Sequence, residues 1–108
     1  MADRIETIRK LLTKTPDDVF LHYSLGMELA SRKDLDPAVT AFRRCIELDP
    51  LYVPAYVEAG KCLRSLGRLD DARDMFTAAL APAAKLPETH TRNFIQQQID
   101  ALPRPRGT

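Results

Sequence analysis

The 108-residue sequence contains few residues of the kinds that carry catalysis, bind metals or form cross-links. It has two histidines and two cysteines, and it lacks the His-Glu-x-x-His, Cys-x-x-Cys and glycine-rich phosphate-loop motifs. Two cysteines do not make a disulfide framework, and Cys45 and Cys62 both fall within helical patterns. We therefore expect both cysteines to be reduced and buried. We expect a non-enzymatic protein without a metal or another cofactor.

Long apolar runs and an excess of charge of one sign are also missing. No run approaches the roughly 18 residues that a membrane-spanning helix needs, and the first ten residues, MADRIETIRK, contain no apolar signal-peptide segment. Sixteen Lys and Arg against fifteen Asp and Glu give a net charge of +1, which does not indicate a nucleic-acid-binding surface. We therefore expect a cytoplasmic protein that binds neither nucleic acid nor membranes.

Apolar residues recur at helical spacing in six segments, which Pro, Gly and Asp separate. The expected helices span about 3–14, 18–32, 36–48, 52–65, 70–81 and 88–102. No segment shows the alternation of a strand, so the sequence predicts an all-α fold. We expect Asp36 to cap the third helix. We expect Pro82 either to end the fifth helix near residue 81 or to bend it before a short extra turn. In the sixth helix, we expect Phe94 and Ile95 to share the apolar side.

The sequence matches itself when it is shifted by 34 residues. Residues 35–42, LDPAVTAF, return as residues 69–76, LDDARDMF, and the match continues before them. The matched residues are Pro16, Val19, Gly26, Leu29, Ser31, Leu35, Asp36, Ala38 and Phe42, followed by Pro50, Val53, Gly60, Leu63, Ser65, Leu69, Asp70, Ala72 and Phe76. A period of this length that holds two helices is typical of a helix–turn–helix solenoid. The small residues Gly26 and Ala38 let two helices approach closely, and Phe42 fills the remaining gap.

This pattern resembles the tetratricopeptide repeat. The residues that carry the resemblance are His22, Leu25, Gly26, Leu29, Ala38, Phe42 and Pro50 in the first unit, and Tyr56, Ala59, Gly60, Leu63, Ala72 and Phe76 in the second. The second unit departs from the signature at its end, where Ala84 replaces a proline and Pro82 comes early. The resemblance implies a right-handed solenoid of about six antiparallel helices that binds other proteins.

The resemblance also implies how the chain is divided. We expect one domain over 1–108. Its parts are a half-repeat helix at 3–16, repeats at 17–50 and 51–84, a capping helix at 88–102 and a tail at 103–108.

The second predicted helix carries two apolar stripes, although one is enough for a helix on a protein surface. One stripe contains the packing residues of the repeat, and the other contains Phe20, Tyr23, Met27 and Ala30. In the resembled family, the first helices of successive units line a concave groove that receives peptides. The matching face of the fourth helix offers Val57, Lys61 and Arg64.

These residues form our candidate peptide-binding set: Phe20, Tyr23, Met27, Ala30, Val57, Lys61 and Arg64. A groove that runs from aromatic to basic side chains suits a segment with apolar anchors and a carboxylate. In the alternative interpretation, residues 3–14 cover part of the extra stripe and the two cations are solvated. Members of the resembled family that hold chaperone tails use Lys and Asn on these inner faces. The matching positions here are Tyr23, Met27 and Glu58, which argues against that type of clamp.

A second functional hypothesis is structural. The half-repeat at 3–16 lacks its partner helix, so part of the second helix is left for another copy of the chain to cover. Under this hypothesis the protein is a self-associating scaffold that forms a homodimer through its incomplete N-terminal face.

Overall fold

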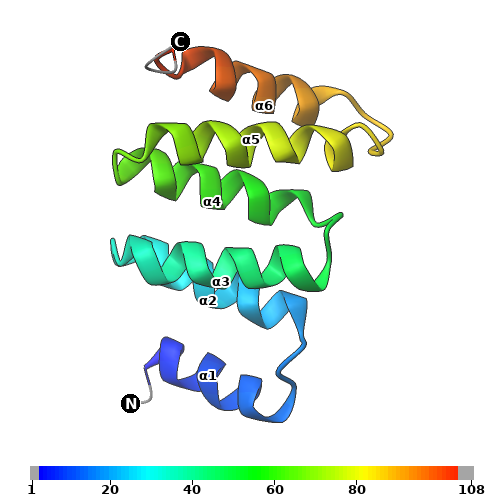
Figure 1. Ribbon diagram of the computed structural model, residues 1–108. Helices are drawn as coiled ribbons and strands as arrows, with labels where there is room; N and C mark the ends of the chain where they lie inside the picture. The colour runs from blue at the N-terminus through cyan, green and yellow to red at the C-terminus, as the bar shows by residue number, and fades with distance from the viewer. Residues whose placement is uncertain (1–2, 105–108) are drawn as a thin grey trace.

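A computed structural model describes residues 3–104 of the chain as six α-helices joined by short connections (Figure 1). The helices are α1 (Arg4–Lys14), α2 (Val19–Ser31), α3 (Leu35–Leu48), α4 (Val53–Ser65), α5 (Leu69–Ala83) and α6 (His90–Ala101). They stack in chain order, so that α1 and α6 lie at opposite ends of the stack (Figure 1). The prediction of an all-α repeat fold with six helices is confirmed.

Aspartates cap the first two helices through their side chains. The Asp3 carboxylate accepts a hydrogen bond from the Ile5 amide at 3.2 Å, and the Asp18 carboxylate accepts one from the Leu21 amide at 3.1 Å. Each bond satisfies a backbone donor that has no partner within its own helix.

The predicted start of the third helix was wrong by one residue. Helix α3 begins at Leu35 with Asp34 as its N-cap residue, so Asp36 lies in the first turn and does not cap the helix. Pro37 allows this start, because the amides of the first turn have no intrahelical acceptor and a proline there costs no hydrogen bond. The Asp36 charge is still favourably placed at the positive end of the helix dipole. Helix α5 likewise begins one residue early, at Leu69.

Of the two outcomes expected for Pro82, the structure shows the extra turn and not an end at residue 81. Helix α5 continues through Pro82 to Ala83, and the Ala84 amide still donates to the Leu80 carbonyl at 3.0 Å. Pro82 removes only one bond of the last turn. Its ring is buried, so packing favours the added turn.

A phenylalanine pressed against a glycine joins the two helices of each repeat. A Cβ atom added at Gly26 would lie 2.6 Å from Phe42 Cε1, and one added at Gly60 would lie 2.5 Å from Phe76 Cε1. Both phenylalanines are completely buried, with 0% exposure. The packing role that the repeat pattern predicts for these small residues is therefore confirmed.

A second contact also recurs after 34 residues. The His22 ring nitrogen Nε2 lies 2.7 Å from the Pro16 carbonyl oxygen, and the Tyr56 hydroxyl donates to the Pro50 carbonyl at 2.7 Å. Because a carbonyl only accepts, the His22 ring donates from Nε2. His22 therefore fastens the connection before its helix, in the same way that Tyr56 does one repeat later.

The two cysteines are free and buried, as the sequence predicts. The Cys45 Sγ atom lies 3.6 Å from the Val19 carbonyl oxygen, between the two helices of the first repeat. Burial raises the pKa of the Cys45 thiol to about 11 and also raises the pKa of Cys62. Both thiols are therefore protonated near neutral pH.

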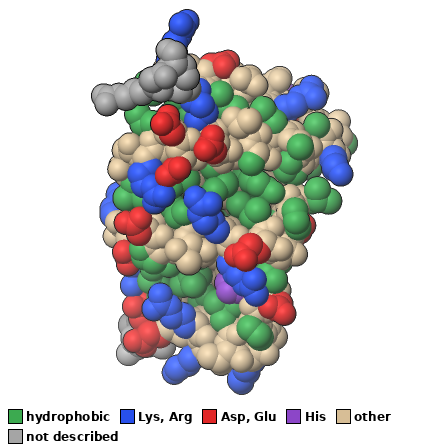
Figure 2. Space-filling model, viewed as in Figure 1, with side chains coloured by type: hydrophobic (Ala, Val, Ile, Leu, Met, Phe, Trp, Pro, Cys, Tyr) green, Lys and Arg blue, Asp and Glu red, His purple; other side chains and the backbone are tan. Residues whose placement is uncertain are grey.

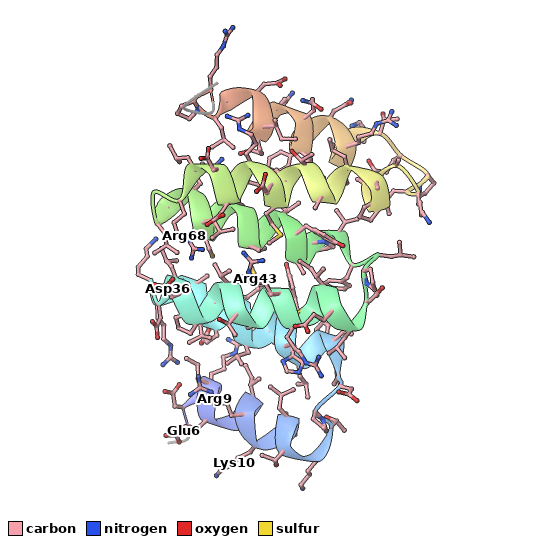
Figure 3. The ribbon with its side chains drawn as sticks, in the orientation of Figure 1. Glu6, Arg9, Lys10, Asp36, Arg43 and Arg68 are labelled. Atoms are coloured by element: carbon pink, nitrogen blue, oxygen red, sulfur yellow. The ribbon has the colours of Figure 1, made fainter. Side chains whose placement is uncertain are left out.

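One ion pair on the surface connects the two repeats within the described residues. Asp36 of α3 and Arg68, which precedes α5, point toward each other, with 3.7 Å between Oδ1 and Nη1 (Figure 3). Arg68 also pairs with Asp71 at 2.8 Å. Exposed pairs of this kind contribute little to stability, so the apolar contacts hold the stack together.

The Gly26–Phe42 contact predicts an unusual effect of a glycine-to-alanine change. Alanine normally stabilises a helix by about 1 kcal/mol relative to glycine. We expect Gly26→Ala instead to lower the free energy of unfolding, because overpacking against the Phe42 ring costs about 1–3 kcal/mol. Urea unfolding followed by circular dichroism measures the change.

The matched control is the same change in a Phe42→Leu background, where the shorter side chain leaves room for the new Cβ atom. There Gly26→Ala should be neutral or stabilising relative to Phe42→Leu alone. Equal losses in the two backgrounds would contradict the proposed cause.

Candidate functional site

Helices α2, α4 and α6 share one face of the stack, which we call the inner face. Side chains of α2 meet those at the start of α4, and side chains of α4 and α6 line a common hollow. The view in Figure 2 has α3 in front of α2, so it does not look directly onto the inner face; apolar side chains gather in it over α4 and α5 and toward the side on which the α3–α4 and α5–α6 connections lie. Leu51 and Leu86 of these connections are 56% and 37% exposed.

The first hollow lies between α1 and α2 and has a volume of about 240 Å³. Its lining comprises Arg4, Ile8, Phe20, Tyr23, Ser24, Met27 and Glu28. Phe20 is 67% exposed and Met27 is 40% exposed, so two large apolar side chains face solvent at its edge. We call this site the α1–α2 hollow.

The second hollow lies between α4 and α6 and has a volume of about 550 Å³. Its apolar lining comprises Leu51, Tyr52, Val53, Pro54, Val57, Leu86 and Phe94, and its polar lining comprises Glu58, His90 and Thr91. Phe94 is 42% exposed and lines the hollow, so part of its side chain is accessible there. We call this site the α4–α6 hollow.

Tyr23 and Tyr52 form the wall between the two hollows. Their ring centroids are 5.3 Å apart in an edge-on arrangement, and each ring lines one of the hollows. Tyr23 also lies 5.7 Å from the ring of buried Phe42, so the wall rests on the core. Burial raises the pKa of Tyr23 and of Tyr52, and both hydroxyls are therefore neutral near pH 7.

The two cations of the candidate set contact other parts of the chain. The Lys61 ammonium lies 3.3 Å from the Glu58 carboxylate. The Arg64 guanidinium donates to the Gln98 side-chain oxygen at 2.6 Å and lies 5.8 Å from the centre of the Phe76 ring. Arg64 thus joins α4 to α6. Its positive charge is also attracted to the aromatic ring of Phe76.

Charges beside the α1–α2 hollow are paired in the same way. Arg32 lies 3.6 Å from the Glu28 carboxylate and 2.5 Å from the Asp3 carboxylate. The hydrogen bonds from Arg32 hold the pKa of Asp3 at about 2. Ion pairs within the chain therefore compensate the acidic groups at the edge of this hollow.

The structure brings together only part of the predicted set. Phe20, Tyr23 and Met27 line the α1–α2 hollow, and Val57 lines the α4–α6 hollow. Ala30, Lys61 and Arg64 line neither hollow, and Ala30 packs against the core. Helix α1 covers one side of the extra stripe of α2 through Arg4 and Ile8, as the alternative interpretation expected in part.

Sequence reasoning missed Leu51, Tyr52, Leu86 and Phe94. The prediction that Phe94 shares the packing side of Ile95 was wrong, because Phe94 is 42% exposed and Ile95 is 0% exposed. Neighbouring residues of a helix point about 100° apart, and this step could have placed Phe94 on the inner face. The other three residues lie in connections, where no helical spacing predicts a direction.

The described part of the chain shows neither a metal-binding cluster nor a membrane-spanning helix. No group of three or more His, Cys, Asp and Glu side chains within residues 3–104 is arranged to hold a metal ion. Over the same residues, every helix is too short or too polar to cross a lipid bilayer.

Comparison with known proteins identifies the family. Tetratricopeptide repeat profiles match residues 21–50 and 41–74. TPR repeat-containing protein PA0015 of Pseudomonas aeruginosa is 34% identical over 80 residues, which cover 74% of this chain and 76% of that protein. The chain therefore belongs to the tetratricopeptide repeat family.

Solved structures with the same fold include two chaperones. The Yersinia enterocolitica type III secretion translocator chaperone SycD has a TM-score of 0.84 and 18% identity, over 90% of this chain and 68% of that one. PcrH, solved in complex with the chaperone-binding region of PopD, has a TM-score of 0.85 and 21% identity, over 90% and 74% of the two chains. At these identities the likeness extends to the fold alone.

The contacts of the two cations predict different effects of their removal. Arg64→Ala should lower the free energy of unfolding by about 1–2 kcal/mol, because it removes the bond to Gln98 and the contact with Phe76. Lys61→Ala should change it by less than about 1 kcal/mol, because it removes only an exposed ion pair. Urea unfolding of both variants measures the difference, and equal effects would show that Arg64 does not join α4 to α6 in solution.

Proposed function

We propose that this chain is a non-enzymatic interaction module that binds a segment of a partner protein along its inner face. The observation that carries the proposal is the pair of adjoining apolar hollows, whose edges expose Phe20, Met27 and Phe94. Exposed apolar side chains that are gathered at one site mark an interaction surface. Membership of the tetratricopeptide repeat family supports the same function, because the family is typically non-enzymatic.

A structural neighbour provides a parallel for this binding mode. PcrH, which shares the fold, was solved with the chaperone-binding region of PopD bound to it. We transfer to this chain only the general mode, in which a helical repeat receives a segment of another protein. The candidate contacts proposed from the sequence remain part of the proposal, with Phe20, Met27 and Val57 as the apolar contacts.

Lys61 and Arg64 have a smaller role in this proposal than the sequence suggests. A bound carboxylate would have to compete with Glu58 for Lys61 and with Gln98 for Arg64. Apolar contacts therefore supply most of the binding energy, and the two cations lie at the edge of the surface.

Affinity capture with matched variants tests the proposal. Phe94→Glu places a charge in the α4–α6 hollow, and because Phe94 is 42% exposed we expect the fold to tolerate it. Its capture of partner proteins should fall at least tenfold, because a charge in an apolar contact is strongly unfavourable. Quantitative mass spectrometry of the captured proteins measures the loss.

Leu11→Glu is the control, because Leu11 is 47% exposed and lines neither hollow. This variant should capture the same proteins as the parent chain. If Phe94→Glu captured the same partners as Leu11→Glu, and both variants had the circular dichroism spectrum of the parent chain, the partners would bind elsewhere on the molecule.

Self-association is the second candidate, and the exposure of Leu11 and Phe20 at the N-terminal end of the stack favours it. If these side chains form a homodimer contact, multi-angle light scattering should give a dimer mass at micromolar concentration. Leu11→Glu should then give a monomer. A monomeric parent chain at high concentration would exclude this function.

A further inference from the structure

The geometry points to a specific ligand for the inner face: an extended segment with two large apolar side chains four residues apart, one in each hollow, and no required carboxylate. This inference rests on the proposed function and adds the chemistry and the spacing of the bound segment. Three observations support it, namely the shared wall between the hollows, the polar groups at their edges and the pairing of the nearby charges.

The wall between the hollows sets the distance between the two anchors. Each anchor would lie at van der Waals distance, about 3.5–4 Å, from the tyrosine ring on its side. Together with the 5.3 Å between the Tyr23 and Tyr52 ring centroids, this places the anchors about 12–13 Å apart. Two side chains at this distance can enter both hollows without moving the wall.

An extended chain meets this distance with four residues, since it rises about 3.3 Å per residue. Successive side chains of an extended chain point to opposite sides, so residues i and i+4 point to the same side. Spacings of three or five residues would turn one anchor away from the inner face. The two anchors must therefore be separated by an even number of residues.

Polar groups at both edges can bond to the backbone of an extended segment. Ser24 and Glu28 line the α1–α2 hollow, and His90 and Thr91 line the α4–α6 hollow. An extended segment brings unpaired N–H and C=O groups to such positions, as in other modes of strand recognition. In a bound helix the backbone N–H and C=O groups already bond to one another, so they would not bond to these side chains.

The charges favour a segment without a net charge at its anchors. Glu58, which lines the α4–α6 hollow, pairs with Lys61, and Glu28, which lines the α1–α2 hollow, pairs with Arg32, so the acidic side chain of each hollow already has a partner. The hollows also differ in size, at about 550 Å³ and about 240 Å³. The larger α4–α6 hollow suits an aromatic anchor, and the smaller α1–α2 hollow suits an aliphatic one.

A series of synthetic peptides tests the spacing. Each peptide has acetyl and amide ends, a fluorescent label and a Ser/Gln background, with Phe and Leu separated by three, four, five or seven residues in both orders. Fluorescence anisotropy with the intact chain measures the affinity. We expect the best peptide to have a spacing of four and to bind at least tenfold more tightly than spacings of three or five, or than single-anchor peptides.

Two variants assign the anchors to the hollows. Phe20→Glu, at the edge of the α1–α2 hollow, and Phe94→Glu, in the α4–α6 hollow, should each weaken the best peptide to the level of a single-anchor peptide. Leu11→Glu should leave its affinity unchanged. Restoring the free C-terminal carboxylate should change the affinity less than threefold.

Other outcomes overturn the inference. Tightest binding at a spacing of seven would mean a helical segment, and equal binding of single-anchor peptides would mean that one hollow is enough. A peptide that binds only with a free carboxylate would mean that Lys61 and Arg64 supply the main contacts to the segment. In these three cases the proposed function stands, because a segment still binds the inner face. Binding that neither glutamate variant weakens would overturn the proposed function as well.

Discussion

The contact between a glycine of one helix and a phenylalanine of the next sets the geometry of the whole stack. Phe42 and Phe76 each lie against a helix backbone where a single added carbon atom would overlap the ring. This contact joins α2 to α3 and α4 to α5 at close range. One side of α2 packs against α3 through this contact. The other apolar stripe of α2 faces α1 and the inner face.

The inner face depends on this contact through Tyr23. The centre of the Tyr23 ring lies 5.7 Å from that of Phe42 and 5.3 Å from that of Tyr52, so the wall between the two hollows is supported by the core. A repeat protein can in this way change its surface residues and keep the shape of its binding face. The packed residues determine the shape of the binding face, and the exposed residues determine which ligands it binds.

The sequence predicts the parts of the fold that recur and misses the parts that do not. The 34-residue match identified Gly26 and Phe42 as packing partners, because each has a counterpart in the second repeat. The start of α3 was wrong by one residue because a proline in the first turn costs no hydrogen bond. The sequence left the end of α5 open between two outcomes because a proline in the last turn removes only one hydrogen bond, which packing can offset. The α4–α6 hollow was missed because α6 and the α5–α6 connection have no second copy in the sequence to compare with. The bond between Arg64 and Gln98 was missed for the same reason.

The helices of the described chain pack mainly on their neighbours in the sequence, and this order has a consequence for how the protein folds (Figure 1). Contacts between elements that are close in the chain close only short loops, and proteins rich in such contacts fold quickly, in microseconds to milliseconds. Such a stack also has no single nucleus on which every contact depends, and its stability is roughly a sum over neighbouring units. Helix α1, which has one buried residue, can therefore open and close without the repeats behind it. Since α1 forms one side of the α1–α2 hollow, the local opening rate of one helix would then govern how fast that half of the inner face exchanges its ligand.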